Sequence, residues 1–141
     1  MLQGVKIFIS YREDAEAYAA RIRDRLEAQG ISFTDISGTA HFEGFTPHID
    51  KAILSCGMVF VLIDKHWLGA LERGQRPLDD PNDFVRQEII AALKLGIRVI
   101  PILLPGAVMP TAEELPPDIA PLAKRKAQEI TDQDFDREIG R

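Results

Sequence analysis

The chain has 141 residues, of which 45% are hydrophobic and 28% are charged, and this composition is typical of one globular domain. Its formal net charge is −5, whereas nucleic-acid binding needs clustered Lys and Arg, so we expect no direct contact with nucleic acid. The apolar run at residues 56–63 is too short to cross a bilayer and no signal-peptide pattern precedes it, so we expect no membrane partner. A single cysteine forms no internal disulfide, which favours a reducing, cytoplasmic compartment.

Residues 5–9, apolar except for Lys6, form a β-favouring run that leads directly into Ser10, Tyr11 and Arg12. A strand that is apolar on both faces belongs in the middle of a parallel sheet, with helices above and below. In such sheets ligands bind outside the carboxyl ends of the strands, where the strand order reverses. We therefore expect Ser10, Tyr11 and Arg12 to lie at the mouth of any binding site.

A helix, a short strand, a loop and a second helix are predicted next. Asp14 can cap the first helix, whose apolar residues recur about every 3.6 positions and which Gly30 ends. Residues 31–34 are predicted to be a strand that closes at Asp35, and residues 36–45 a loop. Thr46 and Pro47 open the second helix, which ends at Gly57. The residues predicted to face inward are Ala15, Tyr18, Ala19, Ile22, Leu26, Ile49, Ala52, Ile53 and Cys56.

Residues 58–63 give the strongest strand pattern in the chain and are predicted to be a central strand. Residues 69–80 are polar and long for a connection in a compact domain, which is typical of a functional loop such as a lid. Asp80 before Pro81 predicts the start of the next helix, which Gly96 ends, and residues 97–104 are predicted to be a fourth core strand. The inward-facing residues of that helix are predicted to be Val85, Ile89, Ala92 and Leu93.

The last part of the chain is rich in proline. Five of the 9 prolines lie in residues 105–121, which we expect to wrap the surface with one helical turn from Thr111. Residues 127–130 are predicted to be an edge strand, and a final helix from Thr131 or Asp132 still runs at Arg141, so this single domain, residues 1–141, is expected to continue into a longer protein. The alternation of strand and helix predicts an α/β fold, a three-layer flavodoxin-like sandwich with about five parallel strands and helices on both faces.

Glu88 is the first candidate for chemistry. On a helical wheel it lies on the flank of the inward-facing stripe and shares a side with Phe84, one turn earlier. The alternative is a surface carboxylate that pairs with Arg86 or Lys94, and periodicity alone favours this alternative.

The second candidate site combines residues 10–12 with the loop at residues 36–44. Arg12 could bind a phosphate with two hydrogen bonds, and Ser10 could hydrogen-bond a ligand. Equally, Ser10 could cap a turn, and Arg12 could pair with Glu13 or Asp14. No metal site is expected, because His41, His48 and His66 lack the spacing of zinc ligands, and Cys56 is predicted to be a core residue.

Several segments, in order, resemble Toll/interleukin-receptor (TIR) domains, and bacterial members most of all. Residues 7–12 are similar to the opening motif of the family, and residues 33–35, the loop to Gly44 and residues 49–53 are similar to its second strand, mobile loop and following helix. Residues 80–89 resemble the helix that carries the catalytic glutamate in TIR domains that cleave NAD+. The chain departs from the family where Phe84 replaces the usual Trp, and residues 37–43 lack the proline often found there.

The resemblance implies an NAD+ hydrolase or cyclase in which Glu88 is the catalytic residue. It implies that Phe84 packs against the ribose or nicotinamide and that Ser10, Tyr11 and Arg12 hold the nucleotide. NAD+ would be the substrate, with no further cofactor, and activity would follow self-association through contacts between TIR domains, with another TIR or sensor domain as a further partner. The implied role is NAD+ depletion or signal production in antiphage defence or host interference. The remaining residues implied to bind substrate are Asp35, Phe42 and Gly44.

Two other functions stay open. The chain could be a non-catalytic signalling module that only recruits or joins other TIR domains through residues 36–44 and the adjacent helices. It could also be similar to nucleoside deoxyribosyltransferases, which share the layered fold and would exchange bases on deoxynucleosides. Within the NAD+ hypothesis, the sequence does not choose among ADP-ribose, a cyclic ADP-ribose isomer and base exchange as the outcome.

Overall fold

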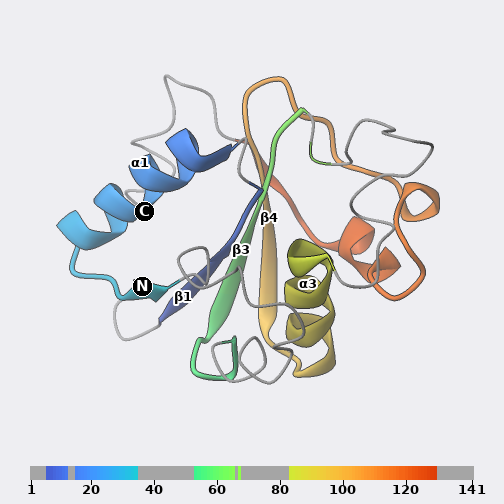
Figure 1. Cartoon of the computed structure of the whole chain (residues 1–141), viewed down its shortest axis with the longest axis horizontal. Helices are drawn as coiled ribbons and strands as arrows, with labels where there is room; N and C mark the ends of the chain where they lie inside the picture. The colour runs from blue at the N-terminus through green and yellow to red at the C-terminus, as the bar shows by residue number, and fades with distance from the viewer. Residues whose placement is uncertain (1–5, 13–14, 35–52, 66, 68–82, 130–141) are drawn as a thin grey trace.

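A parallel sheet of 5 strands lies at the centre of the molecule (Figure 1). The structure, a computed structural model, describes residues 6–12, 15–34, 53–65, 67 and 83–129, without the side chains of residues 34, 84 and 129. The strands run in the order β2-β1-β3-β4-β5, and each pairs with its neighbours in parallel. Their bounds are β1 (Ile7–Ser10), β2 (Phe33–Thr34), β3 (Met58–Ile63), β4 (Arg98–Leu103) and β5 (Gln128–Glu129).

The strand order reverses between β1 and β3. From β1 the chain first passes to β2 on one side, and every later strand is added on the other side, beginning with β3. Ser10, the last residue of β1, is paired with Val61 of β3. The carboxyl ends of β1 and β3 therefore border the point at which ligands bind in sheets of this kind.

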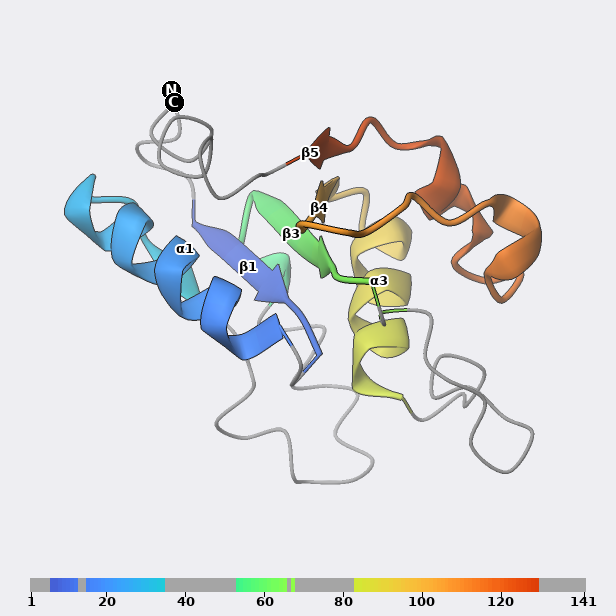
Figure 2. The same cartoon turned by 90° about the horizontal axis from the view of Figure 1, so that it is seen from above.

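Helices α1 (Glu16–Ala28) and α3 (Phe84–Lys94) cover opposite faces of the sheet (Figures 1 and 2). Alternate residues of the central strands supply the two cores, because side chains of a strand point to opposite faces in turn. The predicted three-layer α/β sandwich with a five-stranded parallel sheet is thus confirmed. Ile7, Ile9, Met58, Phe60 and Leu62 pack with α1, whereas Phe8, Val59, Val61 and Ile63 pack with α3.

Helix α1 buries its apolar stripe as predicted. Ala19, Ile22 and Leu26 are buried against the sheet, and Tyr18 is partly buried beside them. The residue before the helix is Ala15, which supplies no side-chain cap, and the predicted capping residue Asp14 lies outside the described residues. At the other end Gly30 has φ +72°, a conformation that glycine adopts without strain, so the predicted helix end is confirmed.

Helix α3 begins later than the sequence predicts. We expected its start at Asp80 and Pro81, but the helix runs from Phe84, and Asp83 is its N-cap in an extended conformation. The Asp83 side chain accepts a hydrogen bond from the backbone N–H of Arg86 at 3.1 Å, which satisfies one of the free donors of the first turn. The inward-facing stripe is as predicted: Val85, Ile89 and Ala92 are buried, and Leu93 is partly buried.

The segment after β4 lies against the α3 side of the sheet. Thr111 caps a short 3-10 helix, η3 (Ala112–Glu114), through a reciprocal capping box with Glu114, so the predicted turn from Thr111 is confirmed. A second 3-10 helix, η4 (Ala120–Lys124), was not predicted, and it adds Leu122 to the core. The edge strand β5 falls within the predicted residues 127–130 but does not include Ala127, and residue 130 lies outside the described residues.

Other predicted elements lie partly or wholly outside the described residues. Of the helix expected from Thr46, only its last residues are described, and Ile53 is buried there. The predicted loops at residues 36–45 and 69–80 and the final helix from Thr131 lie outside. In the described part of the chain, no helix is both long enough and apolar enough to span a membrane.

Candidate functional site

Ser10 and Glu88 meet at the carboxyl end of β1. The Ser10 hydroxyl donates a hydrogen bond of 2.6 Å to Glu88 Oε1, although the two residues are 78 positions apart in the chain. Ser10 is fully buried, and Glu88 is only 5% exposed. The alternative of a solvent-exposed Glu88 is therefore wrong, and so is the alternative in which Ser10 only caps a turn.

The position of Glu88 follows from the pattern of α3. Glu88 lies three residues after Val85 and four before Ala92, so it shares the helix face that packs on the sheet. A carboxylate in an apolar core is costly unless hydrogen bonds replace its lost hydration. The 2.6 Å separation between Ser10 Oγ and Glu88 Oε1 is typical of a strong O–H···O⁻ bond, which supplies part of this replacement.

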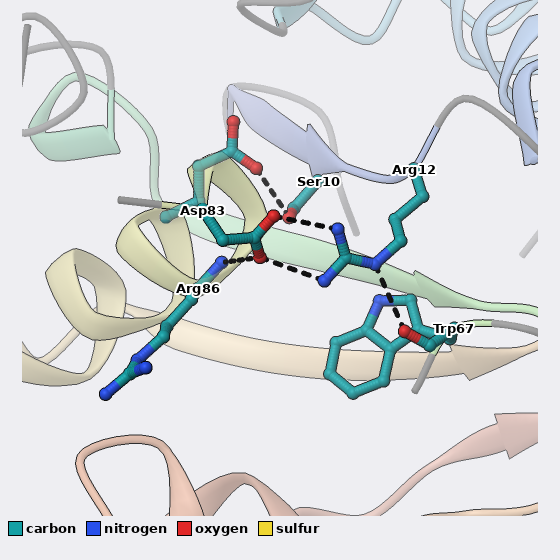
Figure 3. Close-up of polar contacts among 6 residues, drawn as sticks. Ser10, Arg12, Trp67, Asp83 and Arg86 are labelled. Carbon is teal, nitrogen blue, oxygen red and sulfur yellow. Dashed lines mark hydrogen bonds and ion pairs between the residues drawn. The ribbon is translucent and has the colours of Figure 1, made fainter. Parts of the chain in front are cut away.

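Arg12 connects three segments of the site (Figure 3). Its Nη1 and Nη2 donate to the two carboxylate oxygens of Asp83, each at 2.9 Å, and its Nε donates to the backbone carbonyl of Trp67 at 3.1 Å. The side chains of Arg12 and Asp83 are 16% and 12% exposed. The described partner of Arg12 is thus Asp83 of the α3 N-terminus, and the predicted pairs with Glu13 or Asp14 lie outside the described residues.

Trp67 closes this part of the site beyond the end of β3. It is 1% exposed and belongs to the core on the α3 side. Its indole N–H is buried, and no described residue accepts a hydrogen bond from it.

The chain matches one protein family over almost its whole length. Residues 7–140 match the family model described as TIR domain. The chain belongs to the TIR domain family. No protein with a curated description matches it.

Solved structures show the same fold as this TIR domain. One comprises the TIR domains of the activated Roq1 resistosome, which directly recognises the pathogen effector XopQ: identity is 14%, the TM-score is 0.56, and the match covers 86% of this chain and 70% of that one. Another is a metazoan TIR-STING receptor from C. gigas in complex with 2′,3′-cGAMP, with 18% identity and a TM-score of 0.56. That match covers 100% of this chain but 41% of the receptor chain.

Tyr11 of the TIR domain lies on the α1 side, not beside Glu88. Its hydroxyl accepts a hydrogen bond of 3.2 Å from Arg23, whose guanidinium also lies 5.8 Å from the centre of the Tyr11 ring. Arg23 donates in turn to Glu16 at 2.7 Å. The hydrogen bond with Tyr11, followed by the one with Arg23, lowers the pKa of Glu16 below its ordinary value.

The remaining predicted site residues of the TIR domain are not placed. Asp35, Phe42, Gly44 and the side chain of Phe84 lie outside the described residues, as do His41, His48 and His66, and their roles stay predictions. Among the residues that the structure does describe, no group of three His, Cys, Asp or Glu side chains could hold a metal ion. Cys56 is buried in the core as predicted, and its burial raises the pKa of its thiol.

Sequence reasoning missed Asp83 as a site residue. A signal was present, because Asp is a favoured N-cap and Asp83 directly precedes a helix-favouring run. Asp80 followed by Pro81 gave a stronger start pattern, and the ion pair of Asp83 with Arg12, which lies 71 positions away in the chain, cannot be seen in either pattern.

Proposed function

We propose that this TIR domain cleaves the bond between nicotinamide and ribose in NAD+, with Glu88 as the catalytic carboxylate. The observation that carries the proposal is the buried hydrogen bond of 2.6 Å between Ser10 and Glu88. Buried ionisable groups gather at functional sites, because burial and specific partners tune their chemistry. This pair also borders the point between β1 and β3 at which the strand order reverses, where ligands of such sheets bind.

The proposed reaction needs one carboxylate. Nicotinamide leaves NAD+ as a neutral molecule, because the cationic pyridinium ring takes up the electron pair of the broken bond. The leaving group therefore needs no general acid, in contrast with ordinary glycoside hydrolysis, which uses two carboxyl groups. Glu88 would bind the ribose hydroxyls and offset the positive charge that develops at the anomeric carbon.

Ser10 would orient the catalytic carboxylate in this mechanism. Its hydroxyl bonds to Oε1 of Glu88, and both groups are held by regular secondary structure, one at the end of β1 and one within α3. A carboxylate fixed in this way is pre-organised for a charge that appears only in the transition state. We propose further that Phe84 and the loop at residues 36–44 contact the remainder of the nucleotide.

The outcome of the reaction depends on which nucleophile reaches the anomeric carbon. Water gives ADP-ribose, attack by the adenine of the same molecule gives a cyclic isomer, and a free base gives exchange. From the resemblance to bacterial TIR domains, we propose further that the activity serves NAD+ depletion or signal production in the cytoplasm, during antiphage defence or host interference.

A second candidate function is a signalling module that acts by association between TIR domains. The similarity to the TIR domains of the Roq1 resistosome, an assembly by its description, favours this function. The two functions are compatible if assembly precedes catalysis. They differ in one outcome, because a module without catalysis leaves NAD+ intact even when it is concentrated or crowded.

The test is to incubate purified protein with NAD+ and to separate the products by chromatography. The variant Glu88→Gln keeps the size of the side chain and its ability to accept the bond from Ser10, but it removes the charge. Glu113→Gln is the matched control, because Glu113 is an exposed residue of η3. We expect nicotinamide release by the wild type and the control, and release by Glu88→Gln that is lower by about 100-fold or more.

A further inference from the structure

Two interactions join the end of β1 to helix α3. The first is the bond from Ser10 to Glu88, and the second is the bidentate ion pair between Arg12 and Asp83. Ser10 is the last residue of β1 and Arg12 follows it by two residues, whereas Asp83 is the N-cap of α3 and precedes Glu88 by five residues. At about 1.5 Å of rise per residue, the two contact points are about 7.5 Å apart along the helix axis.

Two separate contact points restrict the position of a helix on a sheet more than a single contact point does. A helix held at one point can still turn about that point and slide along the sheet, whereas a second point several ångströms away restricts both movements. The ion pair suits this task because a guanidinium fork on a carboxylate is directional in its plane, unlike the point charge of a lysine. The third donor of Arg12, its Nε, donates to the backbone carbonyl of Trp67 and so also ties the guanidinium to the segment that follows β3.

Asp83 transmits this restraint to the helix itself. Its Oδ2 atom accepts from Arg12 Nη2 at 2.9 Å and from the backbone N–H of Arg86 at 3.1 Å. The same carboxylate is therefore the ion-pair partner of Arg12 and the N-cap of α3. A movement of Arg12 moves the first turn of the helix on which Glu88 lies.

We propose that Arg12 and Asp83 are positioning residues for Glu88, and that Arg12 serves the reaction through Asp83 instead of by contact with substrate. This inference rests on the proposed function for its kinetic part. Displacement of a catalytic group by about 1 Å can lower the rate about 100-fold, so a loosened α3 lowers kcat. It leaves KM nearly unchanged, because neither residue touches NAD+.

The experiment compares Arg12→Lys and Asp83→Asn with a matched control. Asp83→Asn retains a good N-cap but loses the charged fork, and Arg12→Lys retains the charge but loses the two-point geometry. Asp118→Asn is the control, because Asp118, which lies between η3 and η4, forms an ion pair of the same length, 2.9 Å, with Arg86 of α3. We expect kcat to fall about 10-fold to 100-fold in both test variants, and the double variant to be no worse than either single variant. KM stays within about 2-fold of the wild-type value, and the control keeps both constants.

A second readout does not need NAD+. The ¹³C chemical shift of the Glu88 carboxyl group, followed by NMR in the full chain, reports the surroundings of that group directly. We expect it to move in Arg12→Lys and Asp83→Asn and to stay in place in Asp118→Asn. If the wild type leaves NAD+ intact while these shifts move as expected, the proposed reaction is wrong and the positioning of Glu88 stands.

Three results overturn the inference. Wild-type kcat and an unmoved Glu88 carboxyl signal in both test variants would show that the ion pair only adds stability. A raised KM in Arg12→Lys, with Asp83→Asn like the wild type, would show that Arg12 binds the substrate. An equal fall in kcat and an equal shift of the Glu88 carboxyl signal in Asp118→Asn would show that the loss of any ion pair of α3 has this effect, not the loss of the Arg12–Asp83 pair in particular.

Discussion

Glu88 is a carboxylate on a helix face that otherwise carries apolar side chains, and the hydroxyl of Ser10 stabilises it there. Both residues belong to regular elements, so neither can move into solvent without disturbing β1 or α3. The hydrogen bond therefore contributes to folding as well as to the proposed reaction.

The variant Ser10→Ala tests this contribution. Removal of the hydroxyl takes one donor from a buried carboxylate, and we expect the free energy of unfolding to fall by about 1–3 kcal/mol. Denaturation in urea, followed by circular dichroism, measures the change. Ser55→Ala, an exposed serine, is the control and should change the free energy of unfolding by less than about 0.5 kcal/mol. Equal stability of Ser10→Ala and the wild type would show that the bond adds nothing to folding.

A second prediction at this scale concerns pH. The pKa of Glu16 is lowered in the folded protein, so the unfolded state binds protons more readily as pH falls. The stability that Glu16 contributes is fully present above its unfolded pKa and is lost as pH falls through its folded pKa. We expect Glu16→Gln to be slightly less stable than the wild type near neutral pH and to match it once the pH lies below the folded pKa of Glu16. The effect is small, because the Glu16 side chain is 52% exposed.

Urea denaturation at several pH values measures this difference. Tyr11→Phe is the paired variant, since it removes the hydroxyl that contributes most to the lowered pKa of Glu16. Like Glu16→Gln, Tyr11→Phe should weaken the dependence of the free energy of unfolding on pH. The variant that carries both substitutions should weaken it little further. A difference in the free energy of unfolding between the wild type and Glu16→Gln that grows toward acid pH would contradict the lowered pKa of Glu16.

The residue patterns identified Glu88 as a candidate but not its environment. Its place on the flank of the helix stripe was visible from periodicity, as was the position of Ser10 at the end of a strand. The burial of Glu88 was not visible from periodicity. Its partner Ser10, whose hydrogen bond offsets part of the cost of burying the carboxylate, lies 78 residues earlier in the chain. The ion pair of Arg12 was not visible from the sequence either, because its partner Asp83 is 71 residues away.

At the scale of elements, the start of α3 is the feature that most affects the site. Asp83 is its N-cap and is also the ion-pair partner of Arg12. The strand at residues 58–63 was predicted with the bounds that the structure shows, because its apolar run is continuous and Gly57 precedes it. Helix starts are less certain from sequence where several aspartates compete for the cap.

The variant Asp83→Ala tests the role of the cap. Alanine removes the ion pair and the cap together, whereas asparagine removes the ion pair and keeps a cap. We expect Asp83→Ala to lower the free energy of unfolding by about 1 kcal/mol more than Asp83→Asn does. Urea denaturation of both variants checks the difference. Thr111→Ala is the control, because it removes a cap from the short, exposed η3 and should cost less. Indistinguishable Ala and Asn variants would contradict the cap assignment.

At the scale of the whole molecule, the sheet order places the candidate site. The predicted parallel sheet with helices on both faces followed from strands that are apolar on each face. The order β2-β1-β3-β4-β5 did not follow from that pattern, because it depends on the direction in which each connection crosses the sheet. Only the order brings the end of β1 beside β3 and within reach of α3.

The most direct test of the central claim is the initial rate of nicotinamide release from NAD+ by the wild type and by Glu88→Gln, at high protein concentration. We predict release by the wild type and a rate lower by about 100-fold or more in the variant, with the variant folded as the wild type is. Equal rates would remove Glu88 from the reaction. NAD+ left intact by the concentrated wild type would contradict the enzyme itself and leave a TIR domain that acts by association.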